Sequence, residues 1–184
     1  MNCKHLAVLP LAIGAMLLFA GCATTPPVGS AALPKSAPLP DAFGLHQPRA
    51  GLFTGGPPHA DTWPKIAASR VSTVIDLRMP AEKGDGGEAR DVRALGMAYE
   101  ELPIAGAAAI TGENATRLWQ LVSQAEGPVV VHCASGNRVG ALLSIGAWQH
   151  GDMTPRQALE FGKAAGLGSL EPRVRELLQL PPTD

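Results

Sequence analysis

Residues 128–149 read PVVVHCASGNRVGALLSIGAWQ, and this stretch indicates the fold class. Three valines, residues 129–131, follow the breaker Gly127-Pro128 and predict a short buried strand. A polar stretch that contains Cys133 comes next, and from Val139 onward an apolar segment predicts a buried helix. A strand that passes through a short loop into a helix is the repeating unit of an α/β fold.

Strands and helices alternate along the rest of the domain. Runs of apolar or β-branched residues predict further strands at 51–54, 71–77 and 97–103. Capping residues, first-turn prolines and apolar stripes predict helices at 63–69, 87–95, 112–125, 139–149, from 154 onward, and at 172–180. We therefore expect a single α/β domain over residues 49–184, with a mainly parallel central sheet and helices on both faces.

The first 48 residues have a different composition. Residues 1–21 combine a basic start with an apolar run that is too short to span a bilayer, which predicts a secretory signal segment. The run ends in Leu18-Phe19-Ala20-Gly21-Cys22, which resembles a bacterial lipobox whose cysteine is lipidated; an ordinary signal peptide is the alternative. Six prolines among residues 22–48 predict a semi-rigid tether. We expect a protein of the bacterial cell envelope that is anchored to the membrane through lipidated Cys22 and faces the periplasm.

Composition excludes several classes of protein. Hydrophobic residues make up 46% of the chain and charged residues 17%, which excludes a wholly disordered protein. The formal net charge is −1, so we expect no nucleic-acid partner. His46, His59 and His150 lack metal-ligand spacing, and we expect no metal and no other cofactor. Once residues 1–21 are removed and Cys22 is acylated, Cys133 is the only free thiol, so we expect no internal disulfide.

Cys133 lies between a predicted buried strand and a predicted helix, where an anion site can form. Backbone N–H groups there can surround an anion, and the helix dipole also favours a thiolate. These groups belong to Ala134, Ser135, Gly136, Asn137 and Arg138. Arg138 offers a planar fork for two phosphate oxygens, and His132 can orient the loop. A buried, inert cysteine is the alternative, and the glycine and arginine that follow Cys133 argue against it.

His132-Cys133, followed by Gly136 and Arg138, resembles the signature loop of cysteine-dependent protein tyrosine and dual-specificity phosphatases. The chain is similar to small bacterial members of that group, namely the phosphatase-like domain of beta-lactamase-hydrolase-like proteins and the phosphatase domain fused to NAD kinase. Further supporting stretches are residues 51–56, 74–78 and 95–103. The resemblance implies a dual-specificity-phosphatase-like fold. It also implies hydrolysis of a phosphate monoester through a cysteinyl-phosphate on Cys133, with Arg138 binding the phosphoryl group.

Three departures from the phosphatase pattern leave other functions open. Four residues separate Cys133 from Arg138, where that pattern has five, and a six-residue loop of this kind also resembles rhodanese-type sulfurtransferases. Val139 replaces the usual Ser or Thr, and residues 104–110, where the general acid is expected, contain no acid. The alternatives are a sulfurtransferase that uses the same cysteine and a non-catalytic oxyanion-binding module.

Candidates for the general acid therefore come from other segments. Glu113 is the first acid beyond residues 104–110, and Asp76 or Asp85 can serve only if the fold brings them close. Arg78 follows a predicted strand, at the end where α/β proteins bind ligands, so it is a further substrate-binding candidate. A structural salt bridge is the alternative for Arg78, and a buried, hydrogen-bonded carboxylate is the alternative for Asp76.

Overall fold

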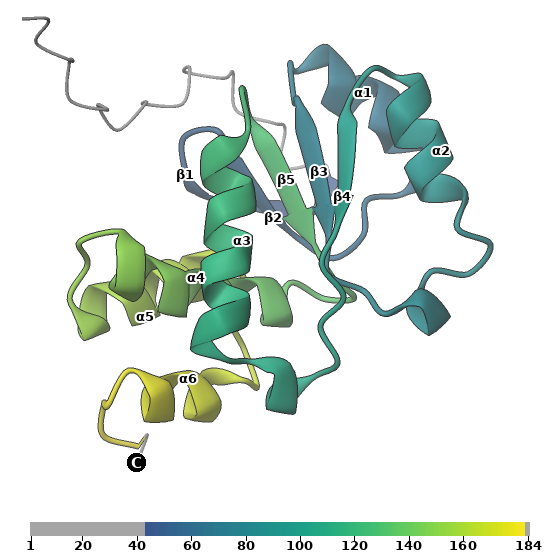
Figure 1. The fold of residues 1–184 in the computed structure, drawn as a ribbon. Coiled ribbons are helices and arrows are strands. Elements are labelled where there is room, and N and C mark those ends of the chain that lie inside the picture. Colours follow the sequence, from purple (N-terminus) through teal and green to yellow (C-terminus); the bar gives the residue numbers. More distant parts are fainter. Residues whose placement is uncertain (1–42, 183–184) are drawn as a thin grey trace, which may run out of the picture. The chain divides into compact units, whose positions relative to one another are not determined.

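The computed structural model describes residues 43–182. A five-stranded sheet lies at its centre, in the order β1–β2–β5–β3–β4 (Figure 1). The strands are β1 (Leu45–Arg49), β2 (Leu52–Gly55), β3 (Thr73–Asp76), β4 (Ala98–Glu101) and β5 (Val129–His132). β2, β5, β3 and β4 are parallel, whereas β1 is antiparallel to β2. The expected α/β domain with a mainly parallel sheet is confirmed.

β1 corrects the boundary between the expected tether and the domain. Leu45 pairs with Gly55, so residues 45–48 belong to the sheet rather than to the tether. Pro48 is tolerated within β1 because an edge strand can leave one ladder position without a donor. Because β1 is antiparallel to β2, the chain enters the sheet at the carboxyl ends of the parallel strands. Cys22 and the expected signal segment lie outside the described residues.

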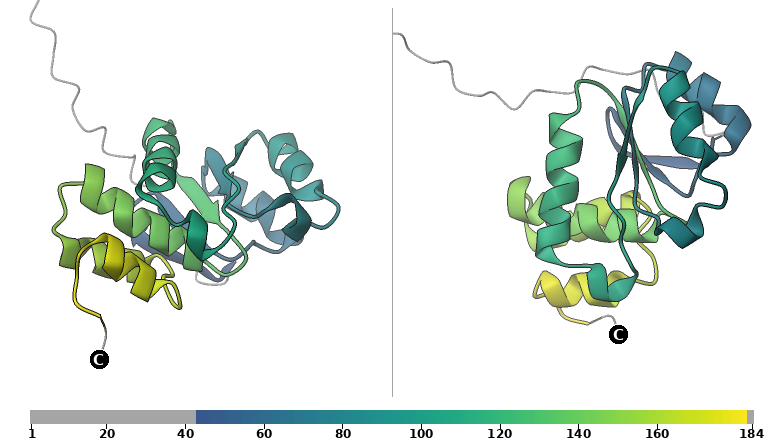
Figure 2. Two further views of the ribbon diagram at one scale, coloured as in Figure 1. Left: turned by 60° about the horizontal axis from the view of Figure 1, so that its bottom comes forward. Right: turned by 45° about the vertical axis from the view of Figure 1, so that its right-hand side comes forward.

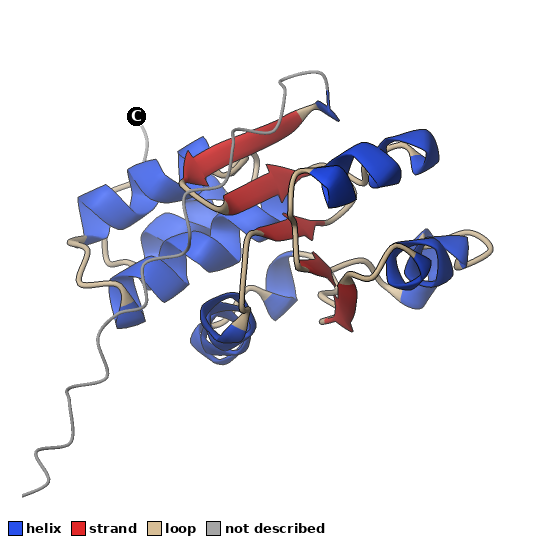
Figure 3. Cartoon of the chain, turned by 90° about the horizontal axis from the view of Figure 1, so that it is seen from above, coloured by secondary structure: helices blue, strands red, loops and turns tan. Residues whose placement is uncertain are grey.

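Helices cover both faces of the sheet, with α1 and α2 on one side and α3 to α6 on the other (Figures 2 and 3). They are α1 (Trp63–Ala68), α2 (Gly87–Ala94), α3 (Gly112–Gln124), α4 (Asn137–His150), α5 (Pro155–Ala164) and α6 (Glu171–Leu177). Short 3₁₀ helices span Ala60–Thr62, Pro80–Glu82 and Ala107–Ala109. Among residues 43–182, no helix combines the length and the apolar character needed to cross a bilayer.

Two hydrophobic cores form because successive strand residues point to opposite faces of the sheet. The core beneath α3 to α6 includes Leu52, Ile75, Val131 and Cys133. The core beneath α1 and α2 includes Phe53, Val74, Val130 and Trp63. The neighbours His132 and Cys133 therefore project to opposite sides of the sheet at the end of β5.

α4 is the central helix of its layer, since it contacts α3, α5 and α6. Every side chain from Arg138 to Ala147 is buried, which agrees with the apolar character of this segment. A Cβ atom on Gly140 would lie 2.2 Å from the backbone nitrogen of Leu167, so only glycine allows this close approach. The approach places the loop after α5 beside the first turn of α4.

Candidate active site

Cys133 directly follows β5 and lies at the carboxyl edge of the sheet. The N–H of Cys133 donates to the carbonyl of Gly55 at 3.1 Å, which extends the pairing of β5 with β2 by one residue. The side chain of Cys133 is fully buried. The N–H of Gly136 donates to Cys133 Sγ at 3.2 Å, just before α4 begins. A helix N-terminus whose N–H points at sulfur favours negative charge on that atom.

The loop between Cys133 and α4 turns on Gly136. Its φ is +85°, and a Cβ atom there would lie 3.3 Å from the Cα of Gly55, so the position requires glycine. Ala134 and Ser135 are exposed, and within residues 43–182 no protein acceptor bonds to their N–H groups. These two N–H groups are available to an anion seated over the thiol, as the sequence predicts.

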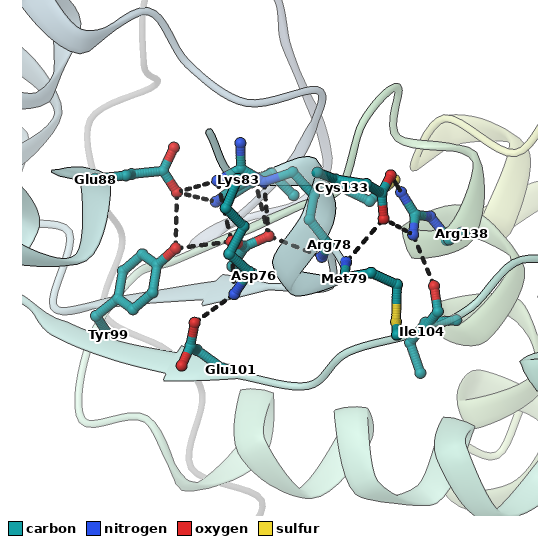
Figure 4. A network of polar contacts seen from close by, with 12 residues as sticks. Asp76, Arg78, Met79, Lys83, Glu88, Tyr99, Glu101, Ile104, Cys133 and Arg138 are labelled. Carbon is teal, nitrogen blue, oxygen red and sulfur yellow. Dashed lines mark hydrogen bonds and ion pairs between the residues drawn. The ribbon is translucent and has the colours of Figure 1, made fainter. Parts of the chain in front are cut away.

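Arg138 lies beside this loop, in the first turn of α4, and its guanidinium is held by two partners (Figure 4). Nη1 donates to the carbonyl of Ile104 at 2.7 Å and to Oε2 of Glu82 at 2.8 Å, and Nη2 donates to Oε1 of Glu82 at 2.6 Å. These bonds use three of the five guanidinium N–H donors. Among the described residues, the Nε–H and one Nη2–H have no hydrogen-bond partner, and a bidentate grip on phosphate requires two such donors.

Glu82 is the residue of this site that sequence reasoning missed. It lies in the loop between β3 and α2, and its Oε2 also accepts from the N–H of Met79 at 2.8 Å. The hydrogen bonds from Arg138 are the main reason that the pKa of Glu82 falls from 4.5 to about 2. The parallel arrangement of β3 and β5 is a signal that could have found Glu82. It places the loop after β3 at the same edge of the sheet as the Cys133 loop.

A buried network of charged side chains surrounds Asp76, at the end of β3 (Figure 4). Asp76 is fully buried and accepts from Arg78 through Nε and Nη2, both at 3.0 Å, and from the hydroxyl of Tyr99 at 2.8 Å. Lys83 Nζ lies 3.2 Å away. Burial opposes ionisation of Asp76, but the bonds from Arg78, helped by charged neighbours, outweigh it and hold the pKa of Asp76 well below its ordinary value.

The contacts in this network give Arg78 and Asp76 structural roles. Arg78 Nη2 also donates to Glu88 at 2.8 Å, so its guanidinium is bound to two carboxylates and forms the structural salt bridge. Burial works against the charge of Arg78, and the bonds to Asp76 overcome it, so the pKa of Arg78 is raised. Asp76 accepts bonds on both oxygens, which makes it a structural carboxylate rather than a proton donor to substrate.

His132 lies on the same side of the sheet as this network. Its Nε2 is 3.0 Å from Glu88 Oε1, and its Nδ1 is 3.8 Å from Asp76 Oδ1. Ligand atoms of these three residues lie within 4.8 Å of one another, a spacing that can hold a metal ion. Arg78 and Lys83 already neutralise the two carboxylates at hydrogen-bond distance. A divalent cation would face two fixed positive charges, so the donor set does not fit a metal.

The side chain of Asn137 has a structural role. Its Oδ1 accepts from the N–H groups of Gly168 and Leu170, at 2.9 and 3.2 Å, and its Nδ2 donates to Ser169 Oγ at 2.8 Å. These bonds fix the loop after α5 against the start of α4. Only the backbone N–H of Asn137 is left for the anion-binding role that the sequence predicts.

Neither remaining acid candidate contacts the thiol or Arg138 in the described part of the chain. Glu113 begins α3, is 74% exposed and forms an ion pair with Arg117 at 2.8 Å. Asp85 is exposed and accepts from the N–H of Gly87 at 3.1 Å. The fold therefore does not bring either carboxylate to the reacting atoms in this structure.

The loop of residues 104–110, which lacks an acid, is held at both ends. Arg138 donates to the carbonyl of Ile104, as described, and Arg173 Nε donates to the carbonyl of Ile110 at 3.4 Å. Asn114 Nδ2 donates to the carbonyl of Ala109 at 2.8 Å. The loop is thus fixed at both ends, it meets the site at the carbonyl of Ile104, and none of its side chains is ionisable.

Sequence comparison agrees with the phosphatase resemblance. No protein-family model matches the chain. Beta-lactamase hydrolase-like proteins from Agrobacterium fabrum and Xylella fastidiosa are each 29% identical over 119 residues, which cover 62% of this chain. The chain spans about a quarter of the length of these curated relatives, since the match covers 27% of each.

Solved structures with the same arrangement identify the fold. A DUF442 protein from Shewanella putrefaciens covers 72% of this chain and 89% of its own (TM-score 0.55, 22% identity), and a Neisseria meningitidis protein covers 72% and 96% (TM-score 0.60, 19% identity). Both are named for an inferred phosphatase activity. TpbA of P. aeruginosa, solved with phosphotyrosine, covers 79% and 90% (TM-score 0.58, 18% identity). The fold is that of the protein tyrosine phosphatases. The resemblance stated from the sequence is confirmed.

Proposed function

We propose that the protein is a cysteine-dependent phosphatase that hydrolyses phosphate monoesters. One observation carries the proposal. The buried Cys133 Sγ accepts a hydrogen bond from an N–H of its own loop, and Arg138, in the first turn of α4, has two guanidinium donors without a partner among the described residues. A thiolate, free loop N–H groups and a bidentate cation are what attack on a phosphoryl group requires. The phosphatase fold and the likeness to beta-lactamase hydrolase-like proteins support it.

The reaction takes two displacements at phosphorus. In the first, the Cys133 thiolate attacks the phosphoryl group, an S–P bond forms, and the P–O bond to the leaving group breaks with its electron pair on oxygen. In the second, water attacks phosphorus, the S–P bond breaks, and inorganic phosphate leaves while the thiolate is regenerated. Arg138 and the loop N–H groups neutralise the charge on the phosphoryl oxygens in both steps.

A side-by-side assay tests this proposal against the two alternatives. The purified protein is given an aryl phosphate in one reaction and thiosulfate with cyanide in another. We expect phosphate release that disappears in Cys133→Ser. Sulfur transfer without phosphate release would instead make the protein a sulfurtransferase. Vanadate binding with activity in neither assay would make it an oxyanion-binding module.

We further propose that Cys22 carries a lipid that anchors the protein to the bacterial membrane, with the domain facing the periplasm. The small residues before Cys22 and the proline-rich segment after it support this proposal. Metabolic labelling with a fatty acid is expected to mark the wild-type protein and not Cys22→Ser. An unlabelled wild-type protein would return residues 1–21 to an ordinary signal peptide.

A further inference from the structure

The carboxyl edge of the sheet, where Cys133 lies, holds more negative than positive charge. Within residues 43–182, the cations of the loop after β3 and of the first turn of α4 are Arg78, Lys83 and Arg138. The carboxylates are those of the loops after β2 and β3 and those paired with these cations, namely Asp61, Asp76, Glu82, Asp85, Glu88 and Glu101. The proposed anion site therefore lies among twice as many carboxylates as cations.

Each of these cations is already bound to a carboxylate. Arg78 and Lys83 each contact two carboxylates of the buried network (Figure 4). Arg138 is paired with Glu82 and keeps two donors, which bind the phosphoryl group in the proposed reaction. A second anionic group on a substrate would therefore meet no unpaired arginine or lysine among the described residues of this edge.

The neighbouring segments add no lysine or arginine. The loops of residues 104–110 and 165–170 adjoin the start of α4, and neither contains a charged residue. His46 and His59, which lie near the same edge, are charged only when protonated, and His59 faces Asp61 at 2.8 Å. The excess of negative charge is thus not offset by these loops.

Asp85 is an exposed carboxylate of this edge that forms no ion pair within the described residues. Its Oδ1 accepts the N–H of Gly87 at 3.1 Å. Asp85 follows Glu82 by three residues, and Glu82 binds Arg138, so the Cα atoms of the two acids are at most ~11 Å apart. The Debye length is about 20 Å at about 20 mM salt, so the charge of Asp85 acts on a bound substrate at low salt.

We propose that the site selects phosphate monoesters in which the phosphoryl group is the only anion and a cationic group lies beside it. The inference rests on the proposed function and names the class of its substrate. Asp85 and the surplus of carboxylates attract a neighbouring ammonium or guanidinium group and repel a second phosphate or carboxylate. A phosphorylated segment with lysine or arginine next to the phosphate has this chemistry, whereas nucleoside polyphosphates and bisphosphorylated sugars do not.

Three phosphotyrosyl peptides test the proposal. They carry alanine, lysine or glutamate on both sides of the same phosphotyrosine, so the leaving group does not change. Phosphate release by the purified protein gives kcat/KM for each peptide. At about 20 mM salt we expect kcat/KM for the lysine peptide to exceed that for the glutamate peptide about fivefold or more, with the alanine peptide between them. At about 500 mM salt, screening should reduce this ratio to about twofold or less.

Matched variants assign the preference to the charge at this edge. Asp85→Asn keeps an oxygen that can accept the N–H of Gly87 but removes the charge, so the ratio of lysine to glutamate peptide should fall about twofold at low salt. Asp85→Lys should lower the ratio further. Glu126→Gln removes the same charge from an exposed residue before β5, at the opposite edge of the sheet, and should leave the ratio unchanged. Any effect of Asp85 on proton donation cancels in the ratio, because every peptide releases the same tyrosine.

Binding of the same peptides to Cys133→Ser, followed by fluorescence anisotropy, measures the charge preference without turnover. A glutamate peptide that is hydrolysed or bound as well as the lysine peptide at low salt would overturn the inference. Equal changes of the ratio in Asp85→Asn and Glu126→Gln would overturn it too. If no peptide released phosphate while the lysine peptide still bound most tightly, the proposed function alone would fail.

Discussion

Arg138 and Glu82 are 56 positions apart in the chain, yet they share two hydrogen bonds of 2.6 and 2.8 Å at the edge of the Cys133 loop. Arg138 comes from the helix after β5, and Glu82 comes from the loop after β3. The loop after β3 thereby holds the guanidinium of Arg138, so the orientation of that group does not depend on α4 alone. The loop after β3 is therefore part of the proposed anion site.

The first prediction concerns Glu82. Glu82→Gln removes the charge that holds the guanidinium, and we expect vanadate affinity to fall about tenfold, as for the loss of one charged hydrogen bond of ~1.5 kcal/mol. Competitive inhibition by vanadate measures the change. Glu113→Gln removes an exposed carboxylate at the start of α3 and should leave the affinity unaltered. Equal losses in the two variants would mean that Glu82 has no special relation to the anion.

The second prediction concerns stability in acid. Arg138 lowers the pKa of Glu82 from 4.5 to about 2, so the folded state holds its proton more weakly than the unfolded state. The resulting stabilisation is fully present above the unfolded value and is lost as pH falls through the folded one. Urea unfolding at pH 6 and pH 3 should therefore show a larger loss of stability for the wild type than for Glu82→Gln. Parallel losses would contradict the ion pair.

The third prediction compares two arginines. Arg138→Lys keeps the charge but removes the planar fork, so both oxyanion affinity and aryl phosphate turnover should fall at least tenfold. Arg78→Lys breaks the bonds to Asp76 and Glu88 and should lower the melting temperature more than it lowers vanadate affinity. If the effects were reversed, the anion site would lie at Arg78.

The fourth prediction uses two glycines with positive φ. Gly136→Ala combines backbone strain with contact against Gly55, so we expect a loss of about 2 kcal/mol or more in stability together with loss of vanadate binding. Gly86→Ala places alanine in the same left-handed region, since the φ and ψ of Gly86 are 69° and 13°, with no atom within 4 Å of its added Cβ. It should cost about 1 kcal/mol and leave binding intact. Denaturant unfolding and vanadate inhibition measure both variants.

The fifth prediction follows from the absence of an acidic residue in the loop of residues 104–110. A phenol-like leaving group departs with little help, whereas an alkoxide needs a proton. Aryl phosphates should therefore be hydrolysed much faster than alkyl phosphates, with a first step that depends steeply on leaving-group pKa. Glu113→Gln should not alter that dependence, because Glu113 lies on the exposed start of α3. A rate that is indifferent to the leaving group would show that an acid reaches the site in the complex.

The sequence predicted the elements whose signals are local. The valines of β5, the caps of α3 and α5, and the glycine before α4 each specify a conformation through neighbouring residues. β1 was not predicted, because a strand that contains Pro48 and polar residues has little apolar pattern. Its pairing with β2 is visible only in three dimensions.

Within the candidate site, the residues that lie close together in the sequence were predicted, and the contact between distant segments was not. Cys133, Gly136 and Arg138 lie within six residues, so their proximity follows from the chain itself. The bond between Glu82 and Arg138 joins two loops, and no local pattern encodes it. The backbone N–H of Asn137 was assigned to the anion because it lies in the loop, and the bond of its side chain to the segment after α5 could not be predicted from the sequence.

The direction of β1 limits where the protein can work. Leu45 pairs with Gly55 on one side of β2, and on the other side the carbonyl of Gly55 accepts the N–H of Cys133. The chain that precedes β1 is therefore attached at the same end of the sheet as the Cys133 loop. With the proposed anchor at Cys22, the chain between Cys22 and Leu45 can stretch at most ~80 Å at ~3.5 Å per residue. With that anchor, the proposed active site would reach only phosphate groups that lie within about this distance of the bilayer surface.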